Sequence, residues 1–238
     1  MRVAVLGLGE AGGRIAADLV AAGVDVSGYD PVVSPGDPAA AVADAPVVLS
    51  LTTAAAARDA AVAALPGLGP GVLYADLNAA APELKRDLAA LVPSFVDVAL
   101  LGAVSVSGLA TPSLASGPAA ERFAELFEPL GMPVEVVSDR PGDASALKLL
   151  RSVFMKGIAA AAVESLEAAE AVGRREWLEA QLAGVITPAL LRRLVEGSRR
   201  HAARRVDEMD AACELLVSLG VEPRIAAASR AVLAELAE

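Results

Sequence analysis

Cysteine and histidine are almost absent from this 238-residue chain, which contains one of each, Cys213 and His201. A single cysteine cannot form a disulfide within the chain, and this fits a protein of the reducing cytoplasm. Zinc sites are usually built from several cysteine and histidine ligands. We therefore expect no metal site of this kind and assign no metal-binding residue.

Aromatic residues are also scarce, at 3%, and the formal net charge is −10. Nucleic-acid-binding proteins are typically basic, so this composition argues against a nucleic-acid partner. The apolar runs are alanine-rich and are broken by glycine, proline or charge, and the N-terminus leads into a strand without a basic signal segment. We therefore expect a cytoplasmic protein with no membrane partner.

Hydrophobic residues make up 55% of the chain, so a large core of alanine, valine and leucine can form. Short β-branched runs alternate with alanine-rich helical stretches as far as Val137. The expected strands are 2–6, 24–29, 46–51, 72–75, 95–99 and 134–137, and the expected helices are 11–22, 53–64, 82–91 and 118–130. This alternation predicts an α/β fold, a Rossmann-type doubly wound parallel sheet.

The remainder of the chain reads as all-α. A long helix is expected over 143–172, and helical patterning continues to the end of the sequence with breaks near Gly173, 184–188, Gly197 and 220–223. We therefore predict two domains, 1–140 with the sheet and 141–238 with helices only, joined by the long interdomain helix.

A glycine-rich motif follows the first expected strand and opens the first expected helix. In the G-x-G-x-x-G pattern the glycines permit a tight turn, close approach of a pyrophosphate and packing of the helix on the strand. Free N–H groups at the helix N-terminus favour the anion. A turn that binds nothing is the alternative, but the strand–turn–helix context favours a nicotinamide dinucleotide. The predicted cofactor contacts are Gly7, Leu8, Gly9, Glu10, Ala11 and Gly12.

Asp30 ends the second expected strand, where an acidic residue accepts hydrogen bonds from the adenosine ribose. A carboxylate here repels a 2′-phosphate, so we expect NAD as cofactor. NADP stays possible because Arg14 lies in the first helix. The alternative role for Asp30 is a plain turn, since Asp-Pro is good turn chemistry.

Further segments follow the glycine motif in a recognisable order. They are 49–53 (Leu-Ser-Leu-Thr-Thr), 76–78 (Asp-Leu-Asn) before Pro82, 97–102, 111–117, and Gly142 followed by Lys148. Together they resemble the β-hydroxyacid dehydrogenase family, relatives of 6-phosphogluconate and 3-hydroxyisobutyrate dehydrogenases. The resemblance implies an NAD(P)-dependent oxidoreductase, with cofactor contacts also from Leu51, Thr52, Thr53 and Asn78.

The helical half resembles a smaller branch of this family, whose helical domain has no assigned function. Segments 148–152, 156–157 and 201–209 carry this likeness. Residues 158–172 are alanine-rich on nearly every face of the long helix, and a helix that is apolar all round needs cover. We therefore predict a homodimer through a helical domain that also binds substrate. The alternative is a compact monomer.

The resemblance implies that Lys148 is the general acid/base, exchanging a proton with a small hydroxy or carbonyl substrate as hydride moves. Ser145, Lys148, Ser152 and Lys156 are three or four residues apart and so share one helix face. A solvated polar face is the alternative, but the glycine-to-lysine spacing of the family favours a site. We assign Lys148 and Ser152 to catalysis and Ser145 to substrate binding.

The sequence departs from better-known family members at two positions. Leu101 stands where they carry a serine that grips a carboxylate, and Ser152 stands where they carry asparagine. Leu101 and Gly102 are still expected in the substrate loop, although not for a simple 3-hydroxyacid. His201 and Arg205, one turn apart, either form a solvated basic face or hold an anionic substrate.

Two alternative functions stay open. One is an imine reductase-like enzyme, although imine reductases typically place aspartate or tyrosine where this chain has Lys148. The other is a non-catalytic dinucleotide-binding protein, which the two departures above would permit.

Overall fold

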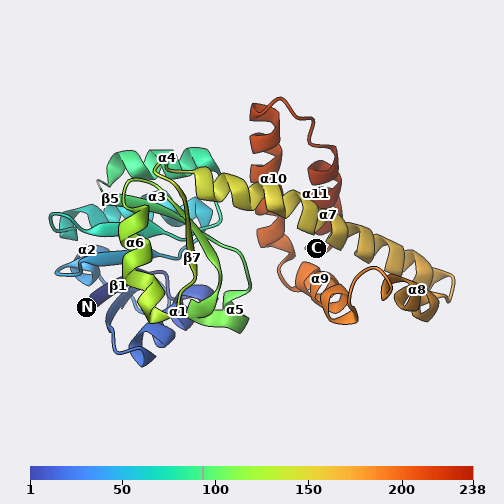
Figure 1. Cartoon of the computed structure of the whole chain (residues 1–238), viewed down its shortest axis with the longest axis horizontal. Helices are drawn as coiled ribbons and strands as arrows, with labels where there is room; N and C mark the ends of the chain where they lie inside the picture. Colours follow the sequence, from blue (N-terminus) through green and yellow to red (C-terminus); the bar gives the residue numbers. More distant parts are fainter. Residues whose placement is uncertain (93, 238) are drawn as a thin grey trace. The chain divides into compact units, whose positions relative to one another are not determined.

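The structure is a computed structural model that describes residues 1–92 and 94–237. It contains two compact units, Met1–Lys148 and Leu149–Glu238. Figure 1 shows a sheet flanked by helices in the first unit and helices alone in the second. The expected fold class, a Rossmann-type sheet followed by an all-α region, is confirmed.

The described part of the first unit contains one seven-stranded sheet. Its strands are β1 (Arg2–Leu6), β2 (Asp25–Tyr29), β3 (Val47–Ser50), β4 (Leu73–Asp76), β5 (Ser94–Leu100), β6 (Ser113–Ser116) and β7 (Val134–Ser138). The spatial order is β2-β1-β3-β4-β5-β6-β7, and only β5 and β6 pair antiparallel. The order reverses between β1 and β3, where open α/β sheets bind ligands beyond the carboxyl ends of the strands.

Helices cover both faces of this sheet (Figure 1). They are α1 (Glu10–Ala21), α2 (Pro38–Val42), α3 (Ala54–Ala64), α4 (Pro82–Leu91), α5 (Val104–Ser107) and α6 (Ala120–Phe127), with short 3₁₀ turns at Leu65–Gly67, Gly108–Ala110 and Glu128–Leu130. Side chains alternate between the two faces of a strand. In β1, Val3 and Val5 therefore join one core with Ile15 of α1, while Ala4 and Leu6 join the other.

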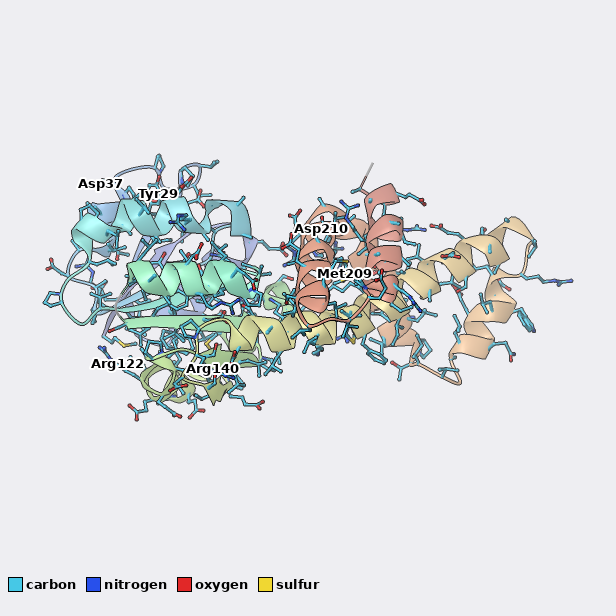
Figure 2. All side chains as sticks on the ribbon, turned by 90° about the horizontal axis from the view of Figure 1, so that it is seen from above. Tyr29, Asp37, Arg122, Arg140, Met209 and Asp210 are labelled. Carbon is cyan, nitrogen blue, oxygen red and sulfur yellow. The ribbon has the colours of Figure 1, made fainter. Side chains whose placement is uncertain are left out.

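One strand and two α-helices of the first unit, β6, α2 and α5, are absent from the expected set. Strand β6 reads Ser-Leu-Ala-Ser and has no β-branched residue, so it is defined by its pairing with β5 and β7 rather than by propensity. Helix α2 has only five residues and begins at the N-cap Asp37, whose carboxylate accepts the backbone N–H of Ala39. Figure 2 labels Asp37 and also Tyr29, the last residue of β2.

The second unit contains most of α7 (Asp143–Ala171) together with α8 (Arg175–Leu182), α9 (Pro188–Arg200), α10 (Ala202–Ser218) and α11 (Arg224–Glu235). Its core includes Val163 and Leu166 of α7 and Leu191 and Val195 of α9. Met209 of α10, labelled in Figure 2, is fully buried. Within residues 1–92 and 94–237, none of the helices combines the length and apolar character needed to cross a membrane.

The break expected at Gly197 is wrong. Gly197 lies inside α9, and the chain turns instead at His201, which ends α9 and precedes α10. A Cβ on Gly197 would lie 2.8 Å from Nη2 of Arg205. The glycine therefore lies within α9, beside the end of the Arg205 side chain, and does not end a helix.

Candidate functional site

Two glycines of the N-terminal loop are required by packing within the chain. Gly7 has a φ of +90°, and a Cβ there would lie 2.4 Å from the carbonyl oxygen of Leu51. A Cβ on Gly12 would lie 1.8 Å from the carbonyl oxygen of Gly7. These glycines hold the start of α1 tightly against the ends of β1 and β3, at the switch point of the sheet.

Gly9 differs from its two neighbours in the motif. Its φ of −64° is accessible to any residue, and a Cβ there would meet no described atom within 4 Å. Packing within the chain therefore gives no reason for glycine at this position. As the N-cap of α1, Gly9 also leaves the first N–H groups of the helix without a side-chain cap. Open space beside such a helix N-terminus fits the pyrophosphate of a dinucleotide.

Asp30 ties this loop to the end of β2. Its Oδ2 accepts the N–H of Leu8 at 2.8 Å, and its Oδ1 accepts the N–H groups of Val32 and Val33 at 2.9 and 3.0 Å. The N–H groups of Val33, Val32 and Leu8, in that order, lower the pKa of Asp30. Asp30 therefore stabilises the turn after β2, which is the alternative role that the sequence left open for it. An ionised carboxylate has about four acceptor sites, so it retains capacity for a ribose hydroxyl.

The loops after β3 and β4 meet beside the glycine loop through Asn78. This buried side chain donates from Nδ2 to Asp76 at 2.7 Å, to Ser50 at 3.2 Å and to Thr52 at 3.3 Å. Thr53 is the N-cap of α3, and its hydroxyl accepts the N–H of Ala56. The structure thus brings together the ends of the two strands that carry the predicted contacts Thr52, Thr53 and Asn78.

Beneath these loops lies a fully buried ion cluster that sequence reasoning did not find. Lys85 of α4 donates to Asp76 of β4 and lies 3.2 Å from Oδ1 of Asp97 in β5, and all three side chains are 0% exposed. Burial alone would lower the pKa of Lys85, but the two carboxylates outweigh burial and raise it. A signal was present in the sequence, because two aspartates on adjacent buried strands require a cation nearby.

Asp97 also holds the first turn of α7. Its Oδ2 accepts the backbone N–H of Ser145 at 2.9 Å, and its Oδ1 accepts the hydroxyl of Ser145 at 2.7 Å. Ser116 accepts the neighbouring N–H of Ala144 at 3.0 Å. Ser145, predicted to contact substrate, is therefore buried against Asp97, and Lys148 lies one turn further along the helix and is half-buried.

The predicted substrate loop starts where β5 ends. Leu101 is half-buried and packs in a small apolar cluster with Ala99 and Ala144, and its backbone N–H donates to Pro112. Gly102 follows as an exposed residue. Leu101 therefore presents no polar group at the position where relatives carry a serine.

A second polar cluster lies in the second unit and contains predicted residue Ser152. The hydroxyl of Ser152 donates to Oε1 of Glu208 in α10, and Nζ of Lys156 lies 2.8 Å from the same oxygen. Burial lowers the pKa of Lys156, and Glu208 opposes that effect only in part. Sequence reasoning missed Glu208, because its partners are more than 50 residues away in the chain.

The basic segment around α10 is partly tied to α9. Arg205 donates from Nη1 to the hydroxyl of Ser198 at 2.8 Å, beside Gly197. His201 is half-buried at the junction of α9 and α10. Arg205 is therefore not part of a fully solvated basic face, which was one of the two readings of this segment.

Lysine is rare in this chain, which has only Lys85, Lys148 and Lys156. Lys85 and Lys156 are committed to ion pairs with buried carboxylates, at 0% and 14% side-chain exposure. Both therefore hold carboxylates of neighbouring elements in place, and the family resemblance assigns proton exchange to Lys148.

Comparisons with known proteins fit this arrangement. Residues 169–236 match a family described as a domain of unknown function, DUF1932. A conserved hypothetical protein from Sinorhizobium meliloti 1021 is 30% identical, with a TM-score of 0.74 over 98% of this chain and 87% of that one. Conserved protein MTH1747, whose structure is described as similar to 3-hydroxyacid dehydrogenases, is also 30% identical, with a TM-score of 0.75 over 99% and 96%. This chain belongs to the β-hydroxyacid dehydrogenase family.

The fold of the family is shared more widely than its sequence. The 3-hydroxyisobutyrate dehydrogenase of Mycobacterium tuberculosis, whose structure was determined with L-serine, has a TM-score of 0.79 at 22% identity. That likeness covers 99% of this chain and 93% of the other. The resemblance to β-hydroxyacid dehydrogenases seen in the sequence is confirmed.

Proposed function

We propose that this member of the β-hydroxyacid dehydrogenase family is an NAD-dependent oxidoreductase that acts on a small hydroxy or carbonyl compound. Gly9 is the observation that carries the proposal. It lies at the switch point of the sheet, at the open N-terminus of α1, and no neighbouring atom requires a glycine there. Close approach of a pyrophosphate explains the residue.

Different residues of the chain bind the different parts of the dinucleotide. The N–H groups at the start of α1 bind the pyrophosphate, and Asp30 accepts a hydrogen bond from the adenosine ribose. The loops after β3 and β4 contact the cofactor through Leu51, Thr52, Thr53 and Asn78. The bound nicotinamide supplies or accepts the hydride.

The cofactor is NAD in preference to NADP. Asp30 is ionised, and no lysine or arginine occurs between Arg14 and Arg58 to neutralise a 2′-phosphate. Arg14 itself is paired with Asp18, at 3.0 Å between Nε and Oδ1. A 2′-phosphate would therefore meet a carboxylate without a compensating cation from this segment.

Lys148 exchanges the proton that accompanies hydride transfer. General acid–base catalysis needs a side chain that both holds and releases a proton, which arginine does not do near neutral pH. Ser152 is assigned to catalysis together with Lys148, and His201 and Arg205 remain predicted contacts on the substrate side. Because Leu101 offers no hydroxyl to a carboxylate, the substrate differs from a simple 3-hydroxyacid.

A panel of small aldehydes, ketones and keto acids, assayed with NADH and NADPH, tests this proposal. Oxidation of NADH with at least one compound is expected, together with at least about tenfold tighter binding of NADH than of NADPH, or about 1.4 kcal/mol. Binding of NADH without turnover of any compound would instead favour the non-catalytic alternative. Equal or reversed affinities would contradict the assigned role of Asp30.

The helical region also forms a homodimer in this proposal. Leu150 and Phe154 are one turn apart on one side of α7 and are 41% and 67% exposed. A second subunit covers them. Light scattering at micromolar concentration is expected to give about twice the chain mass of 24.0 kDa. A mass equal to one chain would contradict the dimer and support the compact monomer.

A further inference from the structure

A continuous hydrogen-bonded path crosses the first unit beneath the proposed cofactor loops. It begins at Thr52 and Asn78, passes through Asp76 and Lys85, and ends at Asp97 and Ser145. Every side chain along it from Asn78 to Ser145 is at most 5% exposed. The path therefore joins the loops after β3 and β4 to the first turn of α7.

A buried ion cluster of this kind contributes little to the stability of the folded protein. Removing charges from water is costly, and well-packed apolar residues often replace a buried ion pair without loss of stability. Two carboxylates that share one lysine are less favourable still, because like charges repel. A positional role explains the cluster better than a contribution to folding.

The ion cluster fixes the position of the first turn of α7. Asp97 accepts both the backbone N–H and the hydroxyl of Ser145, so it sets the height of the helix and its rotation about its own axis. Residues three apart lie on the same side of a helix. Holding Ser145 therefore fixes the direction from which the side chain of Lys148 leaves the helix.

We infer that Asp97 and Ser145, held in place by Lys85, are positioning residues that align Lys148 with the loops carrying Thr52 and Asn78. The inference rests on the proposed function of Lys148. Lys85 offsets the negative charges of Asp76 and Asp97 and so holds Asp97 in place. Asp97 in turn fixes the first turn of α7 through its two hydrogen bonds with Ser145.

The Ser145→Ala variant tests the inference with a small change. It removes the hydroxyl that donates to Asp97 and keeps the backbone N–H bond. We expect kcat to fall about 10- to 100-fold, with the NADH dissociation constant within about twofold of wild type, because proton transfer depends on geometry to within an ångström. Ser145→Thr, which restores a hydroxyl, should recover most of the lost kcat.

Ser229→Ala is the matched control. Ser229 of α11 is 2% exposed and its hydroxyl donates to the carbonyl of Ile225 at 2.8 Å. This variant loses the same group from a buried helical site far along the sequence, and its kcat should stay within about twofold of wild type. If Ser145→Ala keeps the wild-type kcat, the inference is wrong.

Hydrogen exchange gives a readout that does not need turnover. In Ser145→Ala without cofactor, the backbone amides of residues 144–148 should exchange at least about tenfold faster than in wild type, while the glycine loop is unchanged. Asp97→Asn should give a larger increase. If the wild type proves inactive but exchange rises as expected, the proposed function fails and the positioning of α7 stands. Unchanged exchange would overturn the positioning role itself.

Discussion

Replacing Lys148 with methionine is expected to lower kcat by about 10²- to 10⁴-fold, the usual contribution of a general acid or base. The variant keeps a side chain of similar length and loses the exchangeable proton. Because Lys148 is not among the predicted cofactor contacts, the NADH dissociation constant should stay within about threefold of wild type. Steady-state kinetics and a fluorescence titration measure the two quantities separately.

Two further variants separate proton transfer from charge. Lys148→Arg keeps the positive charge but does not release a proton at neutral pH, so it should be nearly as inactive as Lys148→Met. Arg151→Met removes an exposed cation one turn further along α7 and should retain activity within about threefold. Full activity in Lys148→Arg would show that only the charge matters, and full activity in Lys148→Met would remove Lys148 from the mechanism.

Replacing Gly9 with valine is expected to weaken NADH binding by at least about 100-fold, or about 2.7 kcal/mol. The added side chain would fill the space proposed for the pyrophosphate. Since a Cβ at Gly9 meets no described atom within 4 Å and its φ of −64° suits any residue, the melting temperature should stay within about 2 °C of wild type. Calorimetric titration and thermal unfolding test both parts.

Comparison with two other glycines sharpens this result. Gly69→Val places the same side chain in an exposed loop, where a Cβ has an ordinary contact 3.8 Å from Val72, and it should leave NADH affinity unchanged. Gly12→Ala should instead lower the melting temperature, because its Cβ would lie 1.8 Å from a backbone oxygen of Gly7. Wild-type NADH affinity in Gly9→Val would rule out the proposed pyrophosphate position.

The fold was predictable where local pattern and burial agree. Strand β1 and helix α1 have the expected bounds to within one residue at each end, because a strand with four buried apolar residues, a glycine turn and a helix follow each other directly. Strand β6 was not predictable, since Ser-Leu-Ala-Ser is extended only through its neighbours β5 and β7. Gly197 misled the prediction because glycine favours a helix end, but here the packing of α9 keeps it inside a helix.

The candidate site divides in the same way. The glycine loop and Asp30 follow β1 and β2 in a pattern that the sequence reveals, and the structure places them at the switch point. Asn78 was assigned through the family resemblance, and the structure places it after β4, where it donates to Thr52. Lys85 and Glu208 were missed because their importance comes from partners on other elements. A lysine on an amphipathic helix looks solvated in the sequence, and only the packed structure turns Lys85 inward between two carboxylates.

The most direct test of the central claim is a deuterium-transfer experiment on the wild-type chain. Reduced NAD carrying deuterium at the transferable position of the nicotinamide ring is incubated with the protein and the panel of carbonyl compounds, and the products are analysed by mass spectrometry. The account predicts an alcohol with one deuterium on the former carbonyl carbon, and no such product from Lys148→Met. Cofactor binding without labelled product from any compound would contradict it.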